Sequence, residues 1–173
     1  DANGNNLTSG GDTVALATTL GTLGSVTDNG DGTYTATLTS ATTTGTATVT
    51  GTVNAAAITD NATVDFIPGP ADATQSTITA SPTSIVADGV TTSTITVQLK
   101  DANGNNLTSG GDTVALATTL GSLGSVTDNG DGTYTATLTS ATTTGTATVT
   151  GTVNAAAITD NATVDFKIGR AHV

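Results

Sequence analysis

The chain has 173 residues, of which 14 are acidic and only 3 are Lys or Arg, giving a formal net charge of −11. A surface this acidic repels phosphate, which argues against nucleic acid and anionic lipid as partners. Cysteine is absent, so the chain has no disulfide framework, no thiolate metal site and no cysteine nucleophile.

The chain contains two copies of one module. Residues 1–66 and 101–166 are identical except that Thr22 is replaced by Ser122. The second copy is preceded by residues 70–100, which carry two predicted strands, and the first copy has no such segment before it. We therefore expect residues 1–66 to form an incomplete module that lacks its first two strands and leaves part of its apolar face uncovered.

A Pro-containing connector joins the two copies. Residues 67–73 read IPGPADA and include Pro68 and Pro70. Because Pro fixes the backbone φ angle, this connector is stiffer than a Gly/Ser linker. Rigid modules joined by stiff connectors form a rod, and duplication of whole modules changes the length of that rod without changing its chemistry.

Strands can be followed in chain order through residues 71–166, the complete copy. Apolar residues alternate with Thr or other polar residues, which is the period of a half-buried strand. Turns rich in Asn, Asp and Gly separate the alternating runs. The apolar residues of the successive runs are Ile78, Ala80, Ile85 and Val86; Ile95, Val97 and Leu99; Val114 and Leu116; Tyr134, Ala136 and Leu138; Ala147, Val149 and Val153; and Ala162, Val164 and Phe166.

About seven strands per module, with no helical periodicity, predict an all-β fold of tandem immunoglobulin-like β-sandwich modules. Every acidic residue is Asp and none is Glu, which favours turns over helices. Aromatic residues make up only 2% of the chain, so we expect a thin core. Thr on the outward faces solvates the sheets while keeping β propensity.

The last seven residues, 167–173, differ from the rest of the chain. After Phe66 the sequence continues IPGPADATQ, but after Phe166 it continues KIGRAHV, and the similarity between the copies stops at that residue. We interpret this segment as a non-native tail, the translation of a sequencing adapter, that follows a window cut from a longer array. A short native basic terminus is the alternative.

The loop DANGNNLTSGGD resembles a calcium-binding loop in its spacing. Asp101, Asn103, Asn105 and Asp112 occupy positions 1, 3, 5 and 12, but Asn106 stands where such a loop needs Gly. Asn, Asp and Gly also form plain hairpin turns, and we favour that interpretation. We therefore assign no metal ligand, no cofactor and no cofactor-binding residue, with calcium kept as an alternative.

The sequence offers no catalytic residues. General acid–base catalysis usually recruits His, Glu or Lys with a shifted pKa. The single His lies in the tail, Glu is absent, and Lys100 lies on the predicted solvent face of its strand. Tyr134, after an Asp-Gly turn, resembles the tyrosine corner of sandwich domains and is interpreted as a structural anchor.

The runs STITASPTSIVADGVTTSTITVQLKDANGNNLTSGGDTVAL and GSVTDNGDGTYTATLTSATTTGTATVTGTV resemble the bacterial immunoglobulin-like repeats of invasin- and intimin-type adhesins. The similarity is greatest to the third extracellular domain of invasin and spans residues 71–166 and, through the repeat, residues 1–66. It implies a β-sandwich module on the bacterial cell surface. It also implies anchoring through an outer-membrane domain that this chain does not contain, and receptor contacts at a distal tip.

Two functions follow from this resemblance. The first is a stalk or spacer module in cell adhesion, which contacts the neighbouring repeats of its own chain while other domains meet host-cell or bacterial-surface receptors. The alternative is a repeat that itself binds a host receptor, a glycan or a neighbouring adhesin. Binding surfaces usually present aromatic residues or Arg, which are scarce here, so we favour the spacer.

Overall fold

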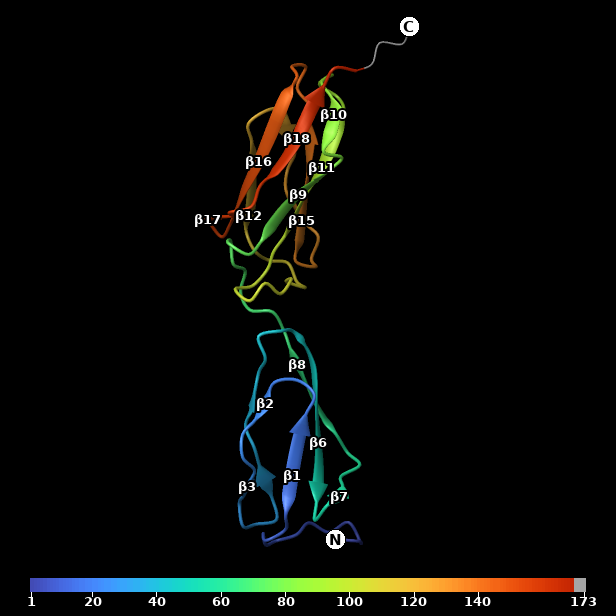
Figure 1. The fold of residues 1–173 in the computed structure, drawn as a ribbon, viewed down its shortest axis with the longest axis vertical. Helices are drawn as coiled ribbons and strands as arrows, with labels where there is room; N and C mark the ends of the chain where they lie inside the picture. The colour runs from blue at the N-terminus through green and yellow to red at the C-terminus, as the bar shows by residue number, and fades with distance from the viewer. Residues whose placement is uncertain (170–173) are drawn as a thin grey trace. The chain divides into compact units, whose positions relative to one another are not determined.

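The computed structural model describes residues 1–169 and divides the chain into two units, Asp1–Ile67 and a second that begins at Pro68. The division falls inside the connector expected from the sequence. Every regular element in residues 1–169 is a strand (Figure 1). Together with the related structures reported below, this confirms the all-β prediction.

The second unit contains two sheets. One has the order β10-β18-β16-β12, with β17 paired to β16, and the other has the order β13-β15-β11-β9, with β14 paired to β15. Most pairs are antiparallel, but β10 runs parallel to β18. The strands are β9 (Thr77–Ser81), β10 (Ser84–Val86), β11 (Thr92–Gln98), β12 (Val114–Thr118), β13 (Ser122–Leu123), β14 (Thr127–Asp128), β15 (Thr133–Thr139), β16 (Gly145–Val153), β17 (Ala156–Ala157) and β18 (Ala162–Lys167).

The core of the second unit lies between these two sheets. Ile95 and Val97 of β11 and Leu138 of β15 come from one sheet, and Val149 of β16 and Val164 of β18 from the other; all five are fully buried. The alternation in the sequence placed each of them on an inward face. The two aromatic residues of the second unit, Tyr134 and Phe166, are also buried, and each is 2% exposed.

Four polar residues are buried with this core, and each has a partner. Ser93 donates its hydroxyl to the carbonyl of Pro82 at 2.7 Å. Ser76 donates to the carbonyl of Asp72, and Ser140 donates to the carboxylate of Asp88. Asp101, the fourth, is described below. No buried side-chain nitrogen or oxygen in the described residues lacks a hydrogen-bond partner, as expected for a well-formed interior.

The first unit has smaller sheets. One has the order β1-β6-β7 with β8 paired to β6, and two further pairs are β2-β5 and β3-β4. Of its hydrophobic residues, only Ala47 is fully buried. The strands are β1 (Val14–Thr18), β2 (Thr22–Leu23), β3 (Thr27–Asp28), β4 (Tyr34–Thr35), β5 (Leu38–Thr39), β6 (Gly45–Val53), β7 (Ala56–Ala57) and β8 (Ala62–Phe66).

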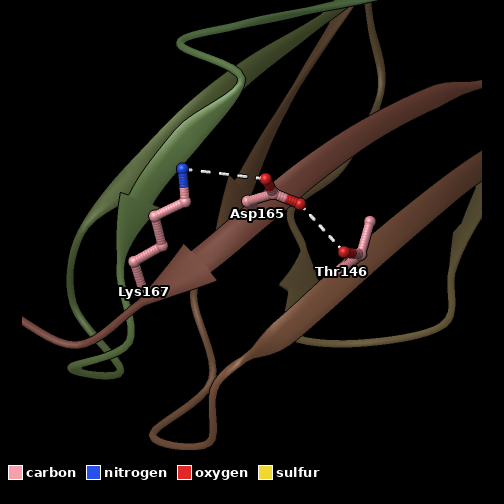
Figure 2. A network of polar contacts seen from close by, with 3 residues as sticks. All are labelled: Thr146, Asp165 and Lys167. Carbon is pink, nitrogen blue, oxygen red and sulfur yellow. Dashed lines mark hydrogen bonds and ion pairs between the residues drawn. The ribbon is translucent and has the colours of Figure 1, made fainter.

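The tail prediction falls partly on described residues. Lys167 extends β18 by one residue and pairs with Val86 of β10. Its ammonium lies 3.7 Å from a carboxylate oxygen of Asp165, whose other oxygen accepts a hydrogen bond from the Thr146 hydroxyl (Figure 2). The two charged side chains are 64% and 50% exposed, so this ion pair contributes little stability. Residues 170–173, with Arg170 and His172, lie outside the described residues.

Candidate functional site

A cluster of hydrogen bonds lies where the connector contacts the rest of the second unit. Asp101 lies at its centre and is only 3% exposed. One carboxylate oxygen accepts hydrogen bonds from the backbone N–H groups of Asn103 and Asn105, both at 2.9 Å. The side-chain amide of Asn105 donates to both oxygens. The DANGNN sequence therefore folds as a tight turn around its own Asp.

The same carboxylate also holds the connector. Its second oxygen accepts a hydrogen bond from the N–H of Gly69 at 2.9 Å. Ala71 forms a β-bridge with Asp101, and the N–H of Asp72 donates to the carbonyl of Lys100 at 2.7 Å. Both side-chain and backbone hydrogen bonds thus join the connector to Lys100 and Asp101, which follow β11 in the second unit.

These hydrogen bonds favour the ionised carboxylate. The Asn105 amide and, next, the Gly69 N–H lower the pKa of Asp101 from its ordinary value to about 2. The group stays charged at any physiological pH. The joint is therefore built around a negative charge that hydrogen-bond donors stabilise.

The residues of the proposed calcium loop have separate partners. Asp112 accepts a hydrogen bond at 2.7 Å from the side chain of Asn154, which lies in the turn between β16 and β17. The Asp101 carboxylate accepts hydrogen bonds from Asn103, Asn105 and the connector residue Gly69. Within residues 1–169, no three His, Cys, Asp or Glu side chains gather as they do around a metal ion. The hydrogen bonds of Asp101 to Asn103 and Asn105 are those of a turn, and calcium binding stays an untested alternative.

The Asp-Gly turn before β15 is stabilised in the same way. Asp128 accepts hydrogen bonds from the N–H groups of Gly130 and Gly111, each at 2.8 Å. Asp131 accepts from the hydroxyl and the N–H of Thr133, and the hydroxyl bond in particular lowers the Asp131 pKa. Asp131 thus stabilises its own turn, and Asp128 also joins that turn to the loop before β12 through Gly111, so both carboxylates have structural roles.

Tyr134 anchors the loop that precedes β12. Its ring is buried, and its hydroxyl accepts the N–H of Asp112 at 2.9 Å. Burial raises the pKa of the Tyr134 hydroxyl, so the group is neutral at physiological pH. The sequence predicted an anchor here but not its partner, which lies 22 residues away in the chain.

Two shallow hollows in the surface of the second unit have no ionisable side chain in their lining. The residues around the first are Thr94, Ser125, Thr127, Thr135, Ala136 and Thr137, and those around the second are Ala115, Leu116, Ala117, Thr150, Gly151, Thr152, Ala157 and Ile158. Hydroxyls and methyl groups alone provide no general acid or base. Residues 1–169 also contain no helix with the length and apolar character needed to span a membrane.

Sequence reasoning missed the contact between Gly69 and Asp101. The two residues are 32 positions apart, and the hydrogen bond joins a connector glycine to a turn aspartate. No local pattern encodes such a pairing. The available signal was the position of Asp101 directly after a predicted strand, beside the entry of the connector.

Comparison with known proteins identifies relatives of this architecture. The family model for invasin domain 3 matches residues 1–69 and 72–169. The Yersinia pseudotuberculosis protein InvD is 34% identical over 100% of this chain and 53% of its own, with a TM-score of 0.68. The Escherichia coli adhesin FdeC is 29% identical over 98% of this chain and 56% of its own, with a TM-score of 0.69.

Invasin itself, described as a bacterial integrin-binding protein, is 37% identical over 90% of this chain and 32% of its own, with a TM-score of 0.55. The chain thus spans about half or less of the length of these relatives. FdeC is described as an adhesin, and the matched family consists of adhesin domains that are not known as enzymes. The matched residues and the strand architecture together show that this chain belongs to the invasin domain 3 family of bacterial immunoglobulin-like adhesin modules.

Proposed function

We propose that this chain is a spacer in the stalk of a bacterial surface adhesin, where it holds a distal binding domain away from the cell. The main support for the proposal is that the connector is held by hydrogen bonds to the second unit. Gly69 and Asp72 are hydrogen-bonded to Asp101 and Lys100, which follow β11, so this part of the connector belongs to the second unit instead of being a free linker. A stalk needs this property because its reach depends on joints that do not collapse.

The surface of the second unit supports the same function. Binding hot spots are enriched in Trp, Tyr and Arg. The chain has no Trp, and Tyr134 and Phe166 are buried in the core. The large hydrophobic residues exposed on this unit are Val86, Val90 and Ile168, which lie at strand ends and in a loop. Such single exposed side chains are ordinary on a protein surface.

The charge also suits an extended stalk outside the cell. A net charge of −11 on a chain of 173 residues keeps neighbouring copies soluble and apart. In this proposal, the chain lies on the bacterial surface, its anchor is an outer-membrane domain elsewhere in the protein, and its immediate partners are neighbouring repeats. Receptor binding belongs to another domain.

Two matched variants test the role of the joint. Asp101→Ala removes the turn and the connector contact together, whereas Asp1→Ala removes the equivalent turn, in which Asp1 accepts from Asn3 and Asn5. Gly69 lies in the unrepeated part of the sequence, so the exchange rate of its amide hydrogen can be assigned by NMR. We expect Asp101→Ala to accelerate this exchange by about tenfold or more and Asp1→Ala to leave it unchanged. A wild-type Gly69 amide that exchanges as fast as in an unstructured peptide would rule out the fastened joint.

A binding assay separates the spacer from the alternative. The full chain is presented to host cells and to extracellular-matrix proteins over a range of concentrations. The proposal requires that no saturable binding occurs while the chain gives a folded β-type circular dichroism spectrum. Saturable binding would place the adhesive site within the repeat and make repeat number a source of avidity.

A further inference from the structure

The turns of the second unit contain two Asn-Gly pairs, which begin at Asn103 and Asn129. Asn followed by Gly is prone to lose its side-chain amide, because the backbone nitrogen of Gly can attack the side-chain carbonyl carbon of Asn without a Cβ in the way. The attack requires that both the Asn side chain and the Gly nitrogen are free to move. The two pairs differ in the hydrogen bonds that hold these groups.

The side-chain amide of Asn129 is held at both ends. Its nitrogen donates to the Thr133 hydroxyl at 2.9 Å, and its oxygen accepts a hydrogen bond from the Thr135 hydroxyl at 3.3 Å. The N–H of the next residue, Gly130, donates to the Asp128 carboxylate at 2.8 Å. Attack on the side chain of Asn129 therefore requires that all of these hydrogen bonds break.

The side-chain amide of Asn103 is free by comparison. It is exposed, and no hydrogen bond to it is present within residues 1–169. The N–H of Gly104 donates to the carbonyl of Asp101 at 2.9 Å. The nearest atom to the point where a Cβ on Gly104 would stand is Oε1 of Gln75, 3.8 Å away, so the surroundings are open. Breaking the hydrogen bond of Gly104 is enough to free both reacting groups.

We propose that Asn103 is a site of spontaneous deamidation, and that the isoaspartate formed there loosens the connector at Gly69. The Gly104 nitrogen loses its proton and bonds to Cγ of Asn103, and the side-chain nitrogen leaves as ammonia. The product is a cyclic imide, which water then opens. Cleavage of the bond from the Gly104 nitrogen to Cγ gives aspartate. Cleavage of its bond to the main-chain carbonyl carbon gives isoaspartate, in which the main chain runs through Cβ and Cγ.

The position of Asn103 links this reaction to the connector. One oxygen of the Asp101 carboxylate accepts the N–H groups of Asn103 and Asn105, both at 2.9 Å. Isoaspartate at position 103 lengthens the main chain between these two groups and moves the second away from its acceptor. It also places a new negative charge near the buried carboxylate, and like charges repel. The other oxygen of Asp101 holds the N–H of Gly69, so the acceptor of this connector hydrogen bond is no longer fixed.

This inference does not rest on the spacer role. The reaction needs only water and proceeds in one direction, so the modified fraction grows with the age of the chain. In the proposed stalk, older chains would have looser joints than new ones. The assays of the spacer role use fresh chain, so a failure of one proposal leaves the other in place.

Ageing the full chain in mildly alkaline buffer tests the site, because base removes the Gly104 proton. Lys100 is the only Lys or Arg before residue 167, so trypsin separates the copies as residues 1–100 and 101–167. Mass spectrometry with electron-transfer fragmentation measures Asn, aspartate and isoaspartate at each position. We expect Asn103 to react about fivefold faster than Asn129 or more, since two additional hydrogen bonds hold the Asn129 side chain.

The first copy provides a second held site. The amide of Asn29 donates to the Thr33 hydroxyl and accepts from the Thr35 hydroxyl, as its counterpart Asn129 does with its own partners. Loss of the Asn29 amide, measured in residues 1–100, should therefore be as slow as loss of the Asn129 amide. A rate at Asn29 or Asn129 that equals the rate at Asn103 would overturn the proposal.

Exchange of the Gly69 amide hydrogen, measured by NMR on the same samples, tests the consequence. Aged chain should contain a fraction that exchanges about tenfold faster or more, in proportion to its isoaspartate at position 103. Asn103→Gln should keep its initial exchange rate on ageing, because attack on Gln needs a larger ring. Asn103→Asp adds the charge without lengthening the main chain, and it should accelerate exchange less than isoaspartate does.

Each variant is compared with its own fresh sample, so a direct effect of the substitution on the turn cancels. Isoaspartate at position 103 with unchanged Gly69 exchange would overturn the link to the connector. Equal acceleration on ageing in the wild type and Asn103→Gln would do the same.

Discussion

Shortening one valine to alanine in each copy measures how much strands β9, β10 and β11, which are present in the second unit alone, contribute to its stability. Val164→Ala removes two buried carbons, which costs about 1.6 kcal/mol in transfer free energy at about 0.8 kcal/mol each. A cavity term raises the expected loss of stability to about 2–3 kcal/mol, because Val164 is completely buried. Val64→Ala removes the same atoms from a side chain that is 43% exposed. There the cost is about 0.9 kcal/mol, and no closed cavity forms.

Scanning calorimetry of the full chain is the assay. We expect two transitions, with the first unit unfolding at the lower temperature because less of its apolar surface is buried. Val164→Ala should lower the upper transition by about 10–20 °C, and Val64→Ala should lower the other by about 4–8 °C. Each variant should leave the transition of the other unit in place. Equal shifts from the two substitutions would refute the reasoning that the face around Val64 is open.

Three further predictions concern the turns and the joint. Gly132→Ala should destabilise the second unit by about 2 kcal/mol or more in urea denaturation, because φ is +83° and a Cβ would overlap the carbonyl of Leu107. Gly130→Ala, at φ +79° with open space around it, should cost less, and a larger loss there would contradict this. Since folding lowers the pKa of Asp101 to about 2, stability from this group should be constant above about pH 4 and lost as the pH falls toward 2. Asp101→Asn should reduce the slope of urea midpoint against pH in that range, and an unchanged slope would count against the role of this carboxylate. A chelator should leave both melting temperatures unchanged, because the loop carboxylates are already hydrogen-bonded; a lowered melting temperature would revive the calcium alternative.

Local alternation predicted much of the core, although it did not find the buried Leu107 and Ile158, and Val86, which it included, is exposed. Ile95, Val97 and Leu138 were placed inward by period alone and are fully buried. Val114 and Leu116 were also placed inward but are only half-buried, because β12 is the edge strand of its sheet. Strand period shows the face of a residue but not the position of the strand in the sheet.

The arrangement of the strands depends on contacts that local sequence does not record. The run around Pro82 was known to be broken, but the structure assigns its two halves, β9 and β10, to different sheets. Residues 33–39 and 133–139 form different strands from one sequence, since strand formation there requires a distant partner. The hydrogen bond from Gly69 to Asp101 was unpredicted for the same reason. The sequence therefore allowed the module and much of its core to be predicted. The contacts of the connector could be found only from the structure.

The parallel pairing of β10 with β18 has a mechanical consequence for a stalk. The chain passes through the connector and β9 before β10 and leaves after β18, so tension that is transmitted to β10 and β18 pulls these two strands in opposite directions along their length. The backbone hydrogen bonds between parallel strands run across the direction of pull. The three residue pairs, Ser84 with Asp165, Ile85 with Phe166 and Val86 with Lys167, are then sheared together instead of being peeled apart one by one. In the proposed stalk, this short parallel contact would act as a clamp that keeps the module closed under tension.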